Sequence, residues 1–82
     1  MKFDLKPIVT EKAVMLIERE NVLAFETEKH ANKDTVKKEI ETLFSVKVEK
    51  VRSLIKHNKK YVYIKLKKEF PAIDVATKLG II

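Results

Sequence analysis

The 82-residue sequence contains no cysteine and no tryptophan, and it has one glycine and two prolines. Without cysteine there are no disulfides and no thiolate ligands for a metal ion, which is typical of proteins in a reducing compartment. No apolar run approaches the ~20 residues that a membrane-spanning helix needs, and the first residues do not resemble a signal peptide. We therefore expect a cytoplasmic protein that has no membrane partner.

Catalytic and cofactor-binding motifs are also missing. A single glycine is too few for a glycine-rich phosphate loop, and the sequence has neither a serine-centred nucleophile motif nor a paired-carboxylate arrangement. The two histidines, His30 and His57, lie in expected connections and belong to no metal-ligand motif. Each is expected to be a solvated loop residue or a contact to sugar and phosphate. The sequence thus predicts no enzyme, no metal, no cofactor and no small-molecule substrate.

The positive charge of the chain is concentrated in one segment. The net charge is +6, but residues 47–68 hold eight lysines, Arg52 and a single acid, Glu49, which gives this segment a charge of +8. The remaining residues carry a balance of −2. Because lysine and arginine release condensed counterions when they neutralise phosphates, such a segment favours binding to a polyanion. Nucleic acid is therefore the first partner to consider.

Length and periodicity predict a single α+β domain over residues 1–82, since a chain of this size holds one core. Seven elements are expected in the order β-α-β-α-β-β-α. Helices then pack against a small antiparallel sheet, which ends in a hairpin followed by a short C-terminal helix. The expected elements are strand 3–7, helix 11–20, strand 22–27, helix 33–44, strand 46–55, turn 57–59, strand 60–67 and helix 71–79.

Local signals predict how these elements begin, end and bend. Thr10 and Asn32 are expected N-caps, and Gly80 is expected to end the last helix, with Ile81 closing a Schellman motif. The apolar residues of strand 46–55 change phase, so a β-bulge is expected near residues 49–50. The helical residues expected to face the core are Val9, Ala13, Leu16 and Ile17; Val36, Ile40, Leu43 and Phe44; and Ala72, Val75, Ala76 and Leu79.

The expected hairpin separates an apolar face from a basic one, because side chains alternate along a strand. Basic residues interleaved with tyrosines on an open sheet face suit phosphate contacts and base stacking. The alternative is that the lysines only prevent edge-to-edge aggregation and the tyrosines fill space. The core face is expected to carry Val51, Ser53, Ile55, Val62, Ile64 and Leu66, and the opposite face Lys50, Arg52, Leu54, Lys56, Tyr61, Tyr63 and Lys65.

The second helix offers another basic surface at its N-terminus. Lys33 and Lys37 lie one turn apart, and Asn32 caps a helix start whose free N–H groups attract anions. The alternative is an ordinary solvated helix face. With the hairpin, this surface completes the RNA-binding residues that we predict: Asn32, Lys33, Lys37, Lys50, Arg52, Lys56, His57, Lys59, Lys60, Tyr61, Tyr63 and Lys65.

Several ordered sequence blocks resemble one family. They are residues 7–13 (PIVTEKA), 21–25 (NVLAF), 31–33 (ANK) with 43–44 (LF), 48–51 (VEKV), 72–76 (AIDVA) and 78–82 (KLGII). On these blocks the chain resembles the L23 family of large-subunit ribosomal proteins, in its archaeal and eukaryotic form. Eukaryotic members carry an N-terminal extension that is not seen here, so we expect an archaeal source.

The resemblance implies a structural protein of the large ribosomal subunit that binds ribosomal RNA beside the exit of the nascent-peptide tunnel. Its implied partners are that RNA, neighbouring ribosomal proteins, and the signal recognition particle or other nascent-chain factors. The family's docking position falls on Glu11, and we add Lys12 and Glu18 to the expected factor-docking surface.

Three departures from the family pattern lie in the hairpin. Arg52 replaces an asparagine of the family strand, and Tyr61 replaces a basic residue. The long bacterial loop that enters the tunnel is reduced here to the turn at 57–59, so this loop is not expected to sense the chain inside the tunnel.

Two other functions stay open at this point. One is a free-standing RNA-binding α+β module, although the lysine/arginine-glycine-phenylalanine strip of an RNA-recognition motif is missing. The other is a protein-interaction adaptor that uses the acidic first helix, which leaves the +8 segment without a purpose.

Overall fold

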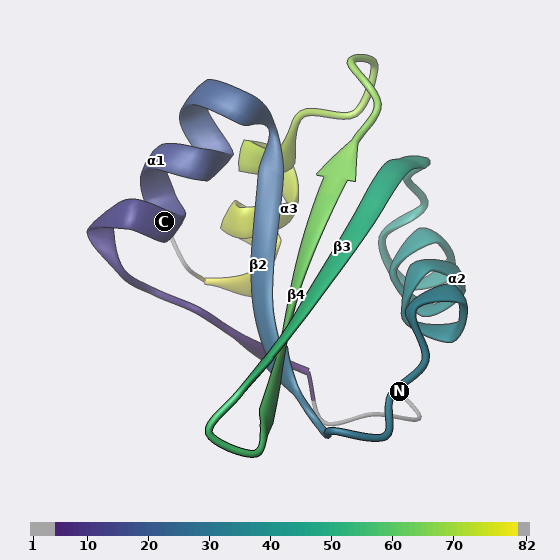
Figure 1. The fold of residues 1–82 in the computed structure, drawn as a ribbon. Coiled ribbons are helices and arrows are strands. Elements are labelled where there is room, and N and C mark those ends of the chain that lie inside the picture. Colours follow the sequence, from purple (N-terminus) through teal and green to yellow (C-terminus); the bar gives the residue numbers. More distant parts are fainter. Residues whose placement is uncertain (1–4, 81–82) are drawn as a thin grey trace.

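The computed structural model describes residues 5–80 and contains a four-stranded antiparallel sheet with three helices (Figure 1). The α+β class and the order of elements predicted from the sequence are confirmed. The expected strand at 3–7 is present as a two-residue strand, and Phe3 lies outside the described residues. The elements are β1 (Lys6–Pro7), α1 (Glu11–Glu20), β2 (Val22–Thr27), α2 (Lys33–Phe44), β3 (Val48–Lys56), β4 (Lys59–Leu66) and α3 (Ala72–Leu79).

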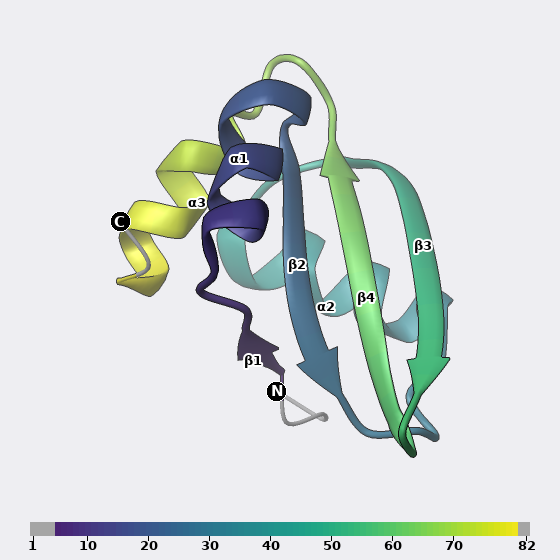
Figure 2. The same ribbon diagram turned by 60° about the vertical axis from the view of Figure 1, so that its left-hand side comes forward.

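The sheet has the strand order β1-β2-β4-β3, so β4 lies in the middle and β3 forms one edge. Helices α2 and α3 cover one face of the sheet, and the other face of the β3–β4 hairpin is left uncovered (Figures 1 and 2). Helix α1 lies along β2 and contacts α3 (Figure 2). We call the uncovered side the open face.

The core lies between the covered face of the sheet and the helices. Leu23 and Phe25 on β2 stand opposite Ile64 and Val62 on β4, and all four are at most 1% exposed. Full burial of side chains of this size stabilises the fold by roughly 1.5–3 kcal/mol each. The helices add Ile17, Val36, Ile40, Val75 and Ala76 to the same cluster.

Both predicted N-caps are confirmed. The Thr10 hydroxyl accepts a hydrogen bond from the Ala13 amide at 3.1 Å, and the Asn32 side-chain oxygen accepts one from the Asp34 amide at 2.8 Å. These bonds satisfy amides that have no partner within the helix. Gly80 ends α3 in the left-handed conformation, as predicted, and the expected contact of Ile81 lies outside the described residues.

Four residues expected in the core or on its side of the sheet are exposed instead. Val9 is 62% exposed because it precedes the N-cap and does not follow the helical period of α1. Leu43 is 51% exposed because Val36, Ile40 and Phe44 already form the stripe of α2 that faces the sheet. Ser53 and Ile55 on β3 are also exposed, Ile55 to 55%, because the turn end of the hairpin extends beyond α2 and α3 (Figure 2).

The hairpin contains the predicted bulge. Val48 pairs with Leu66 and Lys50 with Lys65, so the register shifts by one residue at Glu49. The shift lets Val48 be buried while Val51 also packs against the core. The predicted ends of the last strand were wrong by one residue, because β4 begins at Lys59 and ends at Leu66.

The turn has two residues, His57 and Asn58, rather than three. Both have positive φ, 53° and 63°, and Lys56 pairs with Lys59 on either side of them. Two central residues in the left-handed region make a type I′ turn, whose twist matches that of the strands.

Asn21 connects the end of α1 to the segment between β4 and α3. It ends α1 in the left-handed conformation (φ 58°), and its side-chain amide donates to the carbonyl oxygens of Leu66 and Phe70, both at 3.1 Å. The Lys67 carbonyl accepts from the same nitrogen at 3.3 Å, and the Asn21 side-chain oxygen accepts from the Ala72 amide. One side chain thereby fixes where β4 ends and α3 begins. The sequence did not predict this role.

The exposure of α2 residues predicts a contrast between two substitutions on the same helix. Ile40→Ala should lower the free energy of unfolding by about 2–5 kcal/mol, because it leaves a cavity at a fully buried position. Leu43→Ala should cost less than about 1 kcal/mol, since half of that side chain is already solvated. Urea unfolding measures both, and equal losses would contradict the assignment of the core stripe.

Asn21 predicts a second contrast. Asn21→Gly keeps the left-handed backbone but removes the side-chain hydrogen bonds, so stability should fall by about 2–4 kcal/mol. Asn58→Gly is the matched control, because it replaces an asparagine of similar backbone conformation in the turn and should change stability by no more than about 0.5 kcal/mol. A loss of similar size in both variants would show that backbone conformation, and not the hydrogen bonds, is what matters at Asn21.

Candidate nucleic-acid interface

The predicted alternation of the hairpin is present in the register of its strands. Arg52 stands opposite Tyr63 and Leu54 opposite Tyr61, with Lys50 and Lys65 as the next pair along the strands. None of these side chains shares the face of Val62 and Ile64, so all of them lie on the open face. The residues that β2 adds to this face are Val22, Ala24 and Glu26.

Two cross-strand pairs on the open face join like charges. Lys50 pairs with Lys65, and Lys56 pairs with Lys59. Like charges directly opposite each other destabilise an antiparallel sheet. The arrangement therefore weakens the isolated fold and concentrates positive potential on an uncovered surface.

Lys59 has an acidic neighbour on the adjacent strand β2. Its Nζ lies 3.0 Å from a Glu26 carboxylate oxygen on β2, although the lysine side chain is 59% exposed. The hydrogen bond to this carboxylate, together with its charge, raises the pKa of Lys59. Lys59 thus stays charged, but Glu26 offsets part of its attraction for a phosphate.

Lys60 does not lie on the open face. It stands opposite Thr27 and Ile55, whose side chains share the covered side, and its Nζ donates to the backbone carbonyl of Ala31. This bond ties the β2–α2 connection to the beginning of β4. In the free protein Lys60 is therefore a structural link as well as an RNA-binding candidate.

The remaining candidates form a separate group at the turn end of the molecule. Asn32 and Lys33 begin α2, which lies on the covered side of the sheet, and Lys37 follows one turn later (Figure 1). The bond between Lys60 and Ala31 holds this helix start at the end of the sheet where His57 lies. The structure thus divides the predicted residues between the open face and the turn end.

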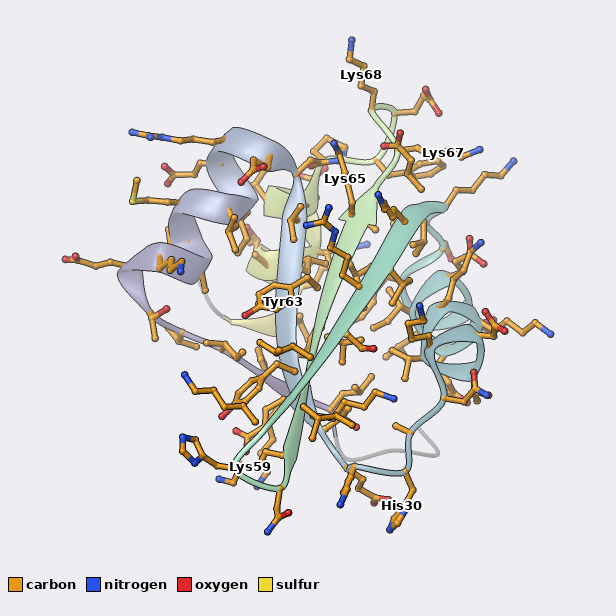
Figure 3. The ribbon with its side chains drawn as sticks, viewed as in Figure 1. His30, Lys59, Tyr63, Lys65, Lys67 and Lys68 are labelled. Carbon is orange, nitrogen blue, oxygen red and sulfur yellow. The ribbon has the colours of Figure 1, made fainter. Side chains whose placement is uncertain are left out.

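Helix α1 forms a wall beside the open face. Figure 3 shows Tyr63 lying in front of β2, on the side toward α1, with Lys65 farther along β4. A cleft of about 380 Å³, which we call the α1 cleft, lies between helix α1 and the β3–β4 hairpin. Its lining residues are Lys12, Leu16, Glu20, Val22, Lys50, Arg52, Tyr63 and Lys65.

Sequence reasoning did not place Lys12 and Glu20 in this cleft. Lys12 was assigned to the factor-docking surface with Glu11 and Glu18. All three are exposed, but only Lys12 lines the α1 cleft. Glu11 and Glu18 are seven residues apart and share another face of α1. The signal in the sequence was the four-residue spacing of Lys12, Leu16 and Glu20, which places these side chains on one helical stripe.

Two further findings bear on the class of site. Residues 5–80 contain no group of three or more histidine, aspartate or glutamate side chains arranged to hold a metal ion. Across the same residues, no helix has the length and apolar character that a bilayer crossing requires.

The chain resembles known proteins along nearly its whole length. The sequence matches the family described as Ribosomal protein L23 over residues 2–76. It is also similar to the large ribosomal subunit protein uL23 of the archaeon Picrophilus torridus. The two chains are 40% identical over 81 residues, which cover 99% of each.

Proposed function

The chain belongs to the ribosomal protein L23 family and is a structural constituent of the large ribosomal subunit, and from this premise we propose that it binds ribosomal RNA through the open face of its sheet. It is of the archaeal type, and its place is the ribosome in the cytoplasm of an archaeon. Ribosomal RNA and neighbouring ribosomal proteins are its partners. The family is structural rather than enzymatic.

The observation that carries the proposal is the pairing of like charges on the open face. Lys50 with Lys65 and Lys56 with Lys59 repel each other in the free protein, and phosphates placed between them remove that repulsion. Tyr61 and Tyr63 supply aromatic surface beside these cations, as single-stranded RNA regions require. A lysine-rich face that only prevented aggregation would not need tyrosines between its charges.

We assign the turn end to the same RNA. The start of α2 presents backbone N–H groups and Lys33, while His57 and Lys56 are exposed on the neighbouring hairpin. Because the open face and the turn end meet along the hairpin, one RNA strand can follow both. Cosedimentation tests the assembly itself: the protein should remain with archaeal large subunits through a moderate-salt wash, whereas a free-standing RNA-binding module would be lost.

Family membership also supports a position beside the exit of the nascent-peptide tunnel, with α1 as a docking surface for nascent-chain factors. Glu11 and Glu18 lie exposed on a face of α1 that does not line the α1 cleft, and Met15 between them is 44% exposed. An apolar side chain flanked by two acids suits a basic, partly apolar partner surface. The open face remains available for RNA at the same time.

Removing two of the opposed lysines should change RNA binding and stability in opposite directions. The double variant Lys50→Gln, Lys65→Gln should lower the slope of log affinity against log salt by about 1.4–1.8 for an archaeal large-subunit RNA fragment. The same variant should gain about 0.2–1 kcal/mol of stability, because a cross-strand repulsion is lost. The matched control is Lys38→Gln, Lys78→Gln, which removes the same charge from exposed positions on α2 and α3. Equal slopes for the two variants would remove the open face from the interface.

Charge reversal at Glu11 tests the docking surface. Glu11→Lys should leave incorporation into large subunits intact and slow association of the signal recognition particle with purified ribosomes at low salt. Asp74→Lys is the control, because Asp74 is also an exposed acid in a first helical turn and loses a similar helix-dipole interaction of about 0.3–1 kcal/mol. If stopped-flow rates fall equally in both variants, or in neither, Glu11 only complements its helix.

A further inference from the structure

We propose that the α1 cleft holds one unpaired nucleotide of the bound RNA, with its base against Tyr63 and its phosphate among the cations, and that Glu20 selects guanine. The inference rests on the proposed function, because it assumes that the open face binds RNA. It goes beyond that function in naming the ligand, its conformation and the residue that reads it.

The size and lining of the cleft favour a single base over a double helix. Its volume of about 380 Å³ lies near the lower end of the roughly 300–1,000 Å³ found for sites that enclose one small molecule. Helix α1 closes one side, so an RNA duplex cannot enter, whereas an unstacked base can. Leu16, Val22 and Tyr63 supply the apolar surface that a base needs.

Tyr63 is positioned as a stacking platform. It stands directly opposite Ala24, which is buried and does not line the cleft, and it borders the cleft while half-buried itself. A ring held between a strand and a helix loses little freedom when a base stacks on it. Tyr61 lies two residues away on the same face but does not line the cleft.

The charges of the cleft suit a nucleotide better than an uncharged ligand. Lys12 approaches from α1, and Lys50, Arg52 and Lys65 come from the hairpin, so four cations surround one acid. A phosphate attached to the base would neutralise part of this excess. The neighbouring hollow of about 670 Å³ is a poorer site, because it has no aromatic residue and is lined by three acids, Glu20, Glu49 and Glu69.

Glu20 is the residue that a simple phosphate site would not contain. Within residues 5–80 its carboxylate forms no ion pair within 4.0 Å, so both oxygens are open to a ligand. A carboxylate accepts hydrogen bonds from base N–H groups. Guanine presents two adjacent donors on its Watson–Crick edge, N1–H and the N2 amino group, and can bind both oxygens. Uracil presents only N3–H, so guanine is favoured.

Nuclear magnetic resonance on the whole 82-residue protein tests the proposal directly. The probes are the single-stranded pentamers UUGUU and UUUUU and a fully paired duplex of similar length. UUGUU should shift the Tyr63 ring protons upfield and bind at least about fivefold more tightly than UUUUU. The duplex should leave the Tyr63 ring resonances in place.

Two variants separate stacking from base reading. Tyr63→Leu should weaken UUGUU binding by between about 5-fold and 150-fold, and Tyr63→Phe should restore it, because the phenyl ring still stacks. Glu20→Gln should abolish the preference for UUGUU over UUUUU. Glu28→Gln removes the same charge outside the cleft and should preserve the preference. Dispersed amide spectra establish that each variant is folded.

The outcomes distinguish this inference from the function on which it rests. If the protein binds its large-subunit RNA fragment but UUGUU leaves the Tyr63 ring unshifted, the cleft proposal is wrong and the proposed function stands. If stacking occurs but Glu20→Gln keeps the guanine preference, the assignment of Glu20 is overturned. If the wild-type protein binds neither the fragment nor the pentamers, both proposals fail.

Discussion

Strand β4 is the constraint on which both surfaces of the molecule depend. It lies between β2 and β3, and because successive side chains of a strand point to opposite faces, its residues alternate between the core and the open face. Val62, Ile64 and Leu66 anchor the core, while Tyr61, Tyr63 and Lys65 form the centre of the open face. A slip of one residue would place the tyrosines in the core and Val62, Ile64 and Leu66 in solvent. The core therefore fixes the register of the proposed RNA surface.

Asn21 links the end of helix α1 to the end of strand β4. Its backbone carbonyl accepts from the Leu66 amide at 3.1 Å, and its side chain bonds to the β4–α3 connection and to the start of α3. The end of α1 is thereby held at the end of β4. The same hydrogen bonds therefore hold Glu20, which precedes Asn21 and lines the α1 cleft, near the end of β4.

Stability and function compete on the open face. The core and the hydrogen-bonded caps stabilise a fold that tolerates opposed lysines at Lys50 with Lys65 and at Lys56 with Lys59. Glu26 relieves only the second of these pairs, through its 3.0 Å contact with Lys59. The first pair lines the α1 cleft and forms no ion pair with Glu20 there, and in our proposal the phosphates of the RNA supply its counter-charge.

The sequence by itself determined the elements, the two N-caps, the bulge and the two faces of the hairpin. Each of these depends on periodicity or on side chains within a few residues, which a single segment records. Only the tertiary structure decided that Lys12 lines the cleft, that Lys60 ties the β2–α2 connection and that Asn21 bonds to residues 45–51 positions away. The tertiary structure also decided that the side chains of Val9 and Leu43 are exposed. Such contacts form between segments that are distant in the chain, and local pattern does not specify which distant groups meet when the helices pack on the sheet.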